Sequence, residues 1–198
     1  MGRRSDHSRE ELRALIVAEG HRQLAEVGYA RFSAREVAKR IGYSIGTIYN
    51  VFGTLDQLIL AINGETLDLW KAHLEARLSA PTDDRLRMAI KAYFEFAILN
   101  RNLWTALYDF RLPDGDPMPA FYRDKMVSLT YIVEEEIAAH LPVGTADQAP
   151  ALARSLLAVV HGHCFFTLNG TFGLMGETDP LEAAYARVKE AIAAVPPA

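Results

Sequence analysis

Apolar residues recur every three or four positions along almost the whole chain, which is the spacing of one face of an α-helix. Helix-start signals punctuate this pattern: Glu11 follows Ser8 by three residues, and Pro180 follows Asp179. No segment alternates between apolar and polar residues with the period of a β-strand. We therefore predict an all-α protein with helices over residues 8–27, 33–40, 44–50, 54–79, 83–100, 102–111, 119–141, 146–173 and 179–195.

The predicted helices change in length near Thr54. The first three are short and closely spaced, whereas those that follow are long. A shift of this kind predicts a small N-terminal domain over residues 1–53 and a larger helical domain over residues 54–198.

Composition places the chain among soluble globular proteins. Half of its 198 residues are hydrophobic and 23% are charged, so the chain can bury enough apolar surface to offset the entropy of ordering. Its single cysteine, Cys164, cannot form an internal disulfide, which favours a reducing compartment. The first twelve residues carry charges without an apolar segment, so we expect no signal peptide and a cytoplasmic protein.

Charge is spread unevenly along the chain. Residues 1–63 carry 9 Lys and Arg against 7 Asp and Glu, whereas residues 64–198 carry 12 against 18. A mildly basic N-terminal part on an acidic body is expected if only the N-terminal part meets an anionic partner.

A membrane span is an alternative for residues 155–176, which contain no Asp, Glu, Lys or Arg and exceed the length of about 18 residues that a span needs. No basic flank sets an orientation, and four polar residues dilute the stretch: Ser155, His161, His163 and Asn169. A helix buried on most sides explains the pattern more simply.

The segment from Ser33 to Phe52 is typical of a helix-turn-helix. Gly42 lies where a tight turn between two short helices needs a positive φ. Ala38, four residues earlier, is small enough for a close helix crossing, and Ile48 follows Gly42 by six residues. Four apolar residues have the spacing to pack both helices on the helix over 8–27: Val37, Ile41, Ile48 and Val51.

In such a unit the second helix lies in the DNA major groove. Thr47 offers a hydroxyl or a methyl to a base, and Asn50 has the geometry to pair with adenine. Gly46 allows close backbone approach, and Arg3 and Arg4 form an arm that could enter a minor groove. The predicted DNA-binding residues are Ser33, Arg35, Tyr43, Ser44, Gly46, Thr47, Tyr49 and Asn50.

Two alternatives leave out DNA: a structural helical hairpin with a glycine turn, and a helical protein-interaction module. No Asp or Glu occurs between Val37 and Leu55, so nothing on the second helix would repel phosphate. This favours the DNA-binding interpretation over both alternatives.

Residues 8–62 resemble the TetR family of transcriptional repressors. The resemblance rests on Gly28-Tyr29, Phe32-Ser33, Val37-Ala38, Ile41-Gly42 and the string Gly46-Thr47-Ile48-Tyr49 with Phe52. The chain departs from the family pattern at Val51, where His is common, and at Leu55, where Lys is common. The resemblance implies an operator-binding homodimer, and the missing Lys removes a phosphate contact.

For residues 64–198 the resemblance implies a helical domain that dimerises and binds an effector. The predicted helix over 146–173 carries two apolar stripes, as expected of a helix that serves both a core and a partner subunit. With the helix over 179–195, it predicts a two-fold dimer joined by a four-helix bundle, with close approach at Gly162 and Gly170. The string Val159-Val160-His161-Gly162-His163 resembles the His-Gly element of one TetR subtype.

Aromatic and polar residues of the central helices are candidates for a site that binds a small, apolar or aromatic effector. Taken singly, each is more simply explained as a core residue. A ligand there would change the spacing of the two DNA-binding parts and release the operator. The candidate residues are Tyr93, Phe96, Trp104, Tyr108, Phe121, Tyr122, Tyr131, His161, Cys164, Phe165 and Asn169.

No catalytic motif, cofactor-binding motif or metal site is predicted. The chain has no glycine-rich phosphate loop and no nucleophile elbow, so we expect a protein that is not an enzyme. His161 and His163, two apart on a helix, point to different sides, and His161 with Cys164 supplies too few ligands for a metal ion.

Overall fold

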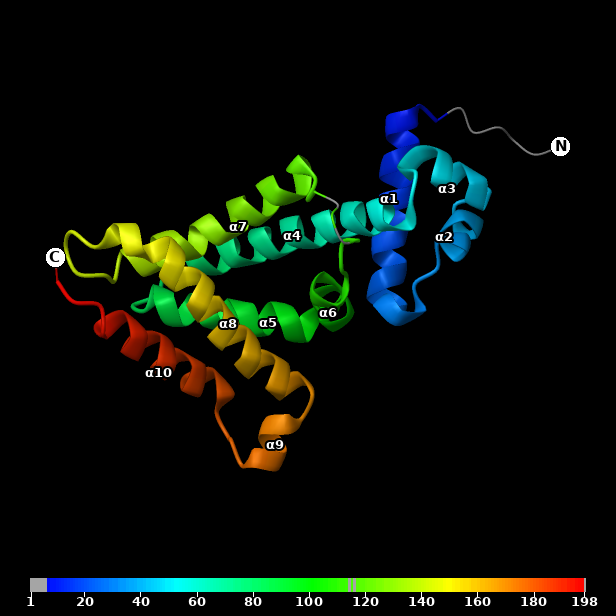
Figure 1. The fold of residues 1–198 in the computed structure, drawn as a ribbon. Coiled ribbons are helices and arrows are strands. Elements are labelled where there is room, and N and C mark those ends of the chain that lie inside the picture. Colours follow the sequence, from blue (N-terminus) through cyan, green and yellow to red (C-terminus); the bar gives the residue numbers. More distant parts are fainter. Residues whose placement is uncertain (1–6, 114, 116, 198) are drawn as a thin grey trace. The chain divides into compact units, whose positions relative to one another are not determined.

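The computed structural model describes residues 7–113, 115 and 117–197, and the described chain is helical with no β-strand. It divides into two compact units (Figure 1). The first comprises Met1–Leu67 and Asn100–Arg123, and the second comprises Asp68–Leu99 and Asp124–Ala198. Arg3 and Arg4, the predicted arm, lie outside the described residues.

The first unit contains a three-helix head and two further helical segments. The head is formed by α1 (Arg9–Val27), α2 (Ala34–Arg40) and α3 (Ile45–Phe52), with the short turn η1 (Tyr29–Arg31) between α1 and α2. The start of α4 (Leu55–Ser79) and all of α6 (Arg101–Asp109) complete its core. The core side chains come from every helix: Ile16, Val17, Leu24, Ala34, Val37, Ala38, Ile48, Phe52, Leu58, Ala61, Ile62, Leu103 and Ala106.

The start of α1 follows the sequence signal closely. The Ser8 side chain accepts a hydrogen bond from the Glu11 backbone, and the Glu11 carboxylate accepts one from the Ser8 backbone at 2.7 Å. These Ser8 hydrogen bonds lower the pKa of Glu11. Both groups satisfy donors that a free helix end would leave without partners.

Helix α6 belongs to the first unit although it follows α5 in the chain. The Asn102 side chain donates a hydrogen bond to the Ala25 carbonyl in the last turn of α1, at 2.8 Å. Phe110, directly after α6, meets the Tyr29 ring edge to face at 6.4 Å. The compact units therefore do not follow chain order, and the functional domains over 1–53 and 54–198 stay a prediction.

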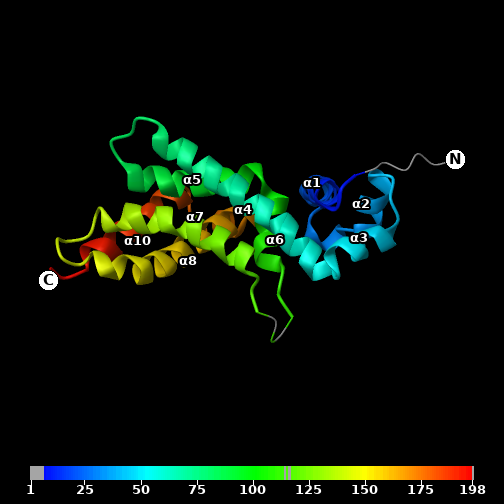
Figure 2. The ribbon, with the colours of Figure 1, turned by 90° about the horizontal axis from the view of Figure 1, so that it is seen from above.

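The second unit contains the rest of α4, α5 (Arg85–Leu99), most of α7 (Ala120–Ala138), α8 (Ala149–Leu168), α9 (Thr171–Met175) and α10 (Pro180–Ala193). Helix α10 packs along α8 and α5 (Figure 2). Two interactions link α10 to the start of α5, namely Arg87 with Glu182 and Tyr185 with Asp84. Arg85 donates from Nε to the buried Glu136 of α7 at 3.1 Å.

The predicted continuous helix over 146–173 is wrong. Residues Ala146–Gln148 form a 3₁₀ turn, η2, because the Thr145 hydroxyl bonds to the Pro142 carbonyl and caps no helix. At the other end Gly170 adopts φ +74°, a left-handed conformation that ends a right-handed helix and separates α8 from α9. Apart from the adjoining residues and the local helix backbone, no heavy atom of the described chain lies within 4 Å of a Cβ built at Gly162 or Gly170, so neither supports a close helix approach within the chain.

Among the described residues, Ala146–Leu168 is long and apolar enough to meet the criterion for a membrane span by itself, with a mean hydropathy of 1.4. The bent pair Ile45–Phe52 and Leu55–Ser79 meets it only when joined across a 77° break. Length and composition of this kind are also found in helices of soluble proteins, so they are weak evidence for a membrane protein.

Candidate nucleic-acid interface

The turn between α2 and α3 has the geometry that the sequence predicts. Gly42 adopts φ +78°, and the Tyr43 backbone donates a hydrogen bond to the Ala38 carbonyl at 2.9 Å. Ala38 is 1% exposed, so the two helices meet there without room for a larger side chain. Glycine at residue 42 avoids the strain that a Cβ would bring at this positive φ.

Helix α3 has one buried and one exposed face. Ile48 and Phe52 lie in the core of the first unit, with Ile45 and Val51 packed beside them. Ser44 is the N-cap: its hydroxyl accepts from the Thr47 backbone at 3.2 Å and lies 3.1 Å from the Thr47 hydroxyl. The buried face holds α3 on α1 and α2 and leaves the other face to the exterior.

The predicted DNA-binding residues lie on this exposed face, in the turn, or at the start of α2. Ser44, Gly46, Tyr49 and Asn50 are exposed, and Thr47 is half-buried beside Ser44. Tyr43, in the turn, is half-buried with its ring 6.5 Å from that of His7. Arg35 is exposed in the first turn of α2, and the half-buried Ser33 caps that helix by accepting from the Glu36 backbone at 3.3 Å.

Two sets of interactions that attach α2 to α1 are absent from the sequence prediction. Gln23 is 2% exposed, and its side-chain oxygen accepts a hydrogen bond from the Ser33 backbone at 3.0 Å. Arg40 pairs with Glu26 at 2.8 Å and with Glu19 at 3.3 Å, both on α1. A buried glutamine on an otherwise apolar face is the one sequence signal that could have indicated the first of these.

The predicted effector residues of the second unit fall into two groups. The buried Tyr93 and half-buried His161 meet, with the Tyr93 hydroxyl 2.9 Å from His161 Nδ1, and the Phe165 ring stacks on His161 at 6.1 Å. Phe96 and Cys164 are fully buried. Tyr131, at 55% exposure, and Asn169 lie on the exterior.

The remaining predicted effector residues belong to the first unit. Trp104 is 2% exposed, and its ring meets that of the half-buried Tyr108 edge to face at 5.2 Å. Tyr122 is buried and Phe121 is exposed, with their rings 6.4 Å apart. The set predicted as one site is thus distributed over both compact units, and its role as a ligand site stays a prediction.

Trp70 is a member of the aromatic cluster that the sequence prediction missed. Its ring stacks on Phe96 at 5.4 Å with an interplanar angle of 8°, and it meets Tyr93 edge to face at 5.0 Å. Along α4 Trp70 continues an ordinary helical spacing with Leu67 and Leu74, so nothing in the sequence distinguishes it from other core residues.

Burial changes the ionisation of two groups on α8. It lowers the pKa of His161, which favours the neutral imidazole, and it raises the pKa of the Cys164 thiol to about 12. A buried thiol of this kind is a poor nucleophile and a poor metal ligand. No group of three or more possible metal ligands occurs among the residues that the structure describes.

Comparison with known proteins places this helix-turn-helix among bacterial regulators. Residues 16–62 match the family model described as "Bacterial regulatory proteins, tetR family". Residues 86–191, more than half of the chain, match the "Tetracyclin repressor-like, C-terminal domain". The chain belongs to the TetR family of transcriptional regulators, whose members are regulators and not enzymes.

Individual relatives agree with this assignment. The HTH-type transcriptional regulator Rv1816 of Mycobacterium tuberculosis is 28% identical over 129 residues, which are 62% of this chain and 51% of that protein. The chain thus spans about half the length of the curated relatives it matches. The family assignment leaves the His-Gly subtype a prediction.

Solved structures share the fold. A protein of unknown function from Rhodococcus sp. RHA1 superposes with a TM-score of 0.71 at 18% identity, covering 98% of this chain and 99% of that one. RolR, solved with the ligand resorcinol, gives a TM-score of 0.66 at 16% identity and covers 96% of both chains. These structures thus share the helical fold of the chain.

Proposed function

We propose that this regulator is a repressor that binds a palindromic operator as a homodimer and is released by a small, largely apolar or aromatic effector. The observation that carries the DNA-binding part is the exposed face of α3. Ser44, Gly46, Tyr49 and Asn50 are exposed there, while Ile48 and Phe52 anchor the opposite face in the core. Small and hydrogen-bonding side chains on a rigidly held helix suit readout of base edges in a major groove.

The dimer rests on helix α8. Only 22% of the 18-residue window of Ala146–Leu168 is buried within the chain, although the window is apolar. Ala153, Leu156 and Val160 face the core, whereas Ala151, Ser155 and Ala158 are exposed. Small exposed residues on a nearly charge-free helix favour burial against a second copy of α8, and α10 lies alongside α8 to complete a four-helix interface.

The effector part rests on the aromatic and polar residues of the second unit. Trp70, Tyr93 and Phe96 form a ring cluster, and the contact between Tyr93 and His161 places a polar pair beside it. A planar ligand carrying one or two polar groups suits such surroundings. The TetR-fold protein RolR binds an aromatic diol, resorcinol, which supports the same ligand class.

Release of DNA requires a helix that the effector moves and that also contacts the head. Helix α6 packs against α1 in the first unit, and Asn102 binds the last turn of α1. Residue Asn100, which precedes α6, directly follows the last residue of α5, the helix that carries Tyr93 and Phe96. A ligand that repositions α5 would therefore change the spacing of the two heads through α6. We place this regulator in the cytoplasm, where its operator DNA lies.

Operator binding is tested by selecting duplexes from a random library with the full-length protein. Thr47→Ala and Tyr49→Ala should each weaken binding to the selected duplex by roughly tenfold or more, because each removes a contact to a base or a phosphate. Circular dichroism should show unchanged helicity, since both side chains lie away from the core.

Selected duplexes should contain two inverted half-sites about 34 Å apart, or one turn of DNA, because a two-fold dimer presents two recognition helices. Binding of both variants at parental strength would overturn the assignment of α3 as the recognition helix. Selection of no preferred sequence would overturn operator binding itself.

A further inference from the structure

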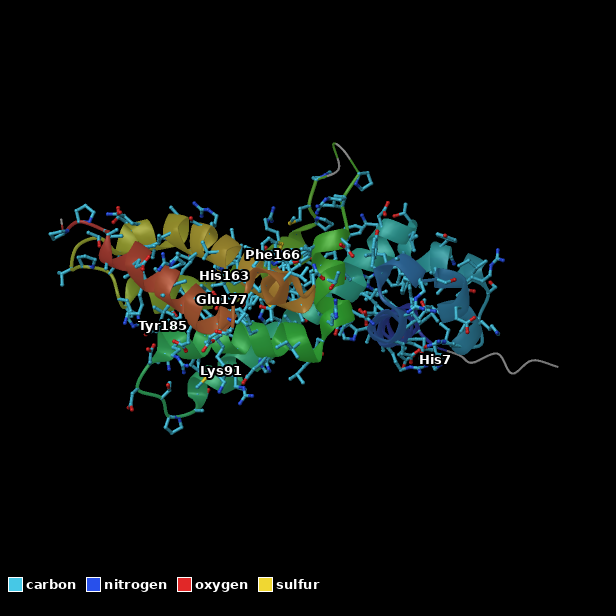
Figure 3. All side chains as sticks on the ribbon, turned by 90° about the horizontal axis from the view of Figure 1, so that it is seen from below. His7, Lys91, His163, Phe166, Glu177 and Tyr185 are labelled. Carbon is cyan, nitrogen blue, oxygen red and sulfur yellow. The ribbon has the colours of Figure 1, made fainter. Side chains whose placement is uncertain are left out.

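The first two turns of α1 lie beside the recognition helix. At the beginning of the described chain, the His7 ring is 6.5 Å from that of Tyr43, the residue before the N-cap of α3; Figure 3 labels His7 at this end. At the other end of α3, the Arg13 guanidinium lies 4.5 Å from the centroid of the Phe52 ring. Residues 7–13 therefore run alongside α3, with one contact near each of its ends.

Two arginines of this segment carry charges that no acidic side chain neutralises within the described structure. Arg9 and Arg13 are exposed, and neither makes an ion pair there. Arg22, Lys39 and Arg40 of the head pair with Glu19, Glu26 or Glu36, and Arg31 donates to the Val27 carbonyl. Arg9 and Arg13 thus place unpaired positive charge next to α3, and Arg35 adds an exposed arginine on α2.

The positions of Arg9 and Arg13 are unfavourable without an anion. Four residues apart on one helix, their side chains share a face, and like charges at this spacing repel each other. Arg9 also occupies the first position of α1, where the helix dipole disfavours a cation. Glu10 and Glu11 lie between them: Glu11 is bound to the backbone of Ser8, and Glu10 makes no ion pair with either arginine in the described structure. A phosphate group near both guanidinium groups would relieve each of these unfavourable terms.

We propose that Arg9 and Arg13 form a phosphate-binding strip that extends the DNA interface from α3 onto α1. The Phe52 ring beneath Arg13 holds its guanidinium plane in place by a cation–π contact, leaving its edge available for charge-assisted hydrogen bonds to phosphate oxygens. The inference rests on the proposed role of α3 as the recognition helix. It adds a sequence-independent contact that fixes the angle at which α3 enters the groove.

The test measures how affinity depends on salt. Binding of the full-length protein to a random-sequence duplex and to a selected duplex is followed by fluorescence anisotropy between about 50 and 200 mM NaCl. Removing one arginine–phosphate interaction should reduce the slope of log K against log salt by about 0.9. Arg13→Gln and Arg9→Gln should each show this change and lower the affinity for both duplexes alike, by roughly tenfold at low salt.

Charge and fold are controlled separately. The double variant Arg9→Lys/Arg13→Lys keeps both charges and should retain most of the slope, whereas Arg9→Gln/Arg13→Gln should abolish both phosphate interactions. As a control, Arg101→Gln removes an equal charge from α6. The residue after Arg101, Asn102, binds the Ala25 carbonyl of α1. Ala25 lies about 18 Å along that helix from Arg13. That distance exceeds the screening length of about 8 to 10 Å, so the slope should be unchanged.

The melting temperature identifies any variant that has not kept its fold. Arg13→Met, whose stem still covers Phe52, replaces Arg13→Gln if the latter melts early. A folded Arg9→Gln/Arg13→Gln variant with the parental slope would overturn the strip, and so would an equal reduction of the slope in the Lys variant. Either of these two results refutes the strip alone if the parent selects an operator and Thr47→Ala no longer binds it. If the parent selects no operator, the recognition-helix proposal itself fails.

Discussion

Two glycines four residues apart in the helix-turn-helix have opposite physical reasons to be glycine. Gly42 adopts φ +78°, which disfavours any side chain even though, beyond its chain neighbours, no heavy atom of the described residues lies within 4 Å of a Cβ built there. Gly46 lies in the helical region of α3, and a Cβ there would meet only the Ser44 hydroxyl, at an ordinary 3.6 Å. The fold therefore demands Gly42 and tolerates a side chain at 46, and the proposed close approach of DNA supplies a reason for glycine at the second position.

Gly46→Ala should separate stability from DNA binding. Alanine in a helix is favoured over glycine by about 0.5 to 1 kcal/mol, so the free energy of unfolding should rise slightly in a urea titration. Binding to the selected duplex should fall, because the methyl group keeps the α3 backbone from the groove. Gly42→Ala is the matched control, with an expected loss of about 1 to 2 kcal/mol. Parental affinity in a Gly46→Ala protein would argue against close backbone approach.

His161 should make the second unit sensitive to acid. Burial lowers the pKa of His161 below 6.5, so the unfolded chain takes up a proton at higher pH than the folded one. Stability is then fully present above about pH 6.5 and is lost as pH falls through the folded pKa. The Nδ1 atom of a neutral imidazole can also accept a hydrogen bond from the Tyr93 hydroxyl, which a protonated imidazole cannot.

We expect the melting temperature of the parent to drop between pH 7 and pH 5 by more than that of His161→Gln. Burial also lowers the pKa of His21. His21 contributes equally to the acid sensitivity of both proteins, so its effect cancels in the comparison. An identical drop in the two proteins would mean that His161 takes no part.

The contact between α1 and α2 depends on one buried side chain. Gln23 accepts the Ser33 backbone hydrogen bond at the point where α2 begins. Gln23→Ala would leave that N–H group without a partner and should lower the free energy of unfolding by about 1 to 2 kcal/mol. Chemical denaturation measures the decrease, and Gln148→Ala, at the exposed N-cap of α8, is the control. A Gln23→Ala protein as stable as the control would show that water replaces the missing acceptor.

Helix positions were predictable where local capping chemistry decides them. Ser8, Asp179 and Ser33 cap α1, α10 and α2 as their sequence signals indicate. The predicted helix start at residue 146 was wrong because the preceding Thr145 hydroxyl bonds backward to the Pro142 carbonyl. The break at Gly170 was missed because glycine within an apolar run is compatible with either a helix or a stop.

In the proposed homodimer, the exposed face of α8 should become buried against the second copy. Ala158 lies on the exposed face of α8, in an apolar window only 22% of which is buried within one chain. Ala158→Glu would place a charge in the proposed interface and should shift the protein from dimer to monomer at micromolar concentration. Sedimentation velocity measures the change. Ala76→Glu, an exposed alanine on α4, is the matched control. A dimer of unchanged stability in Ala158→Glu would move the interface elsewhere.

The helical class, most helix boundaries, the turn at Gly42 and the family followed from the amino-acid sequence, because periodicity, capping and backbone conformation are local properties. The packing of α6 with the head, the attachment of α2 to α1 by Gln23 and Arg40, and the contact of Trp70 with Tyr93 and Phe96 became visible in the folded chain alone. The aromatic residues that were predicted as one site lie in two different compact units of the folded chain. Contacts between residues far apart in the chain depend on how helix faces pack together, and the spacing of residues along a single helix carries no record of that choice.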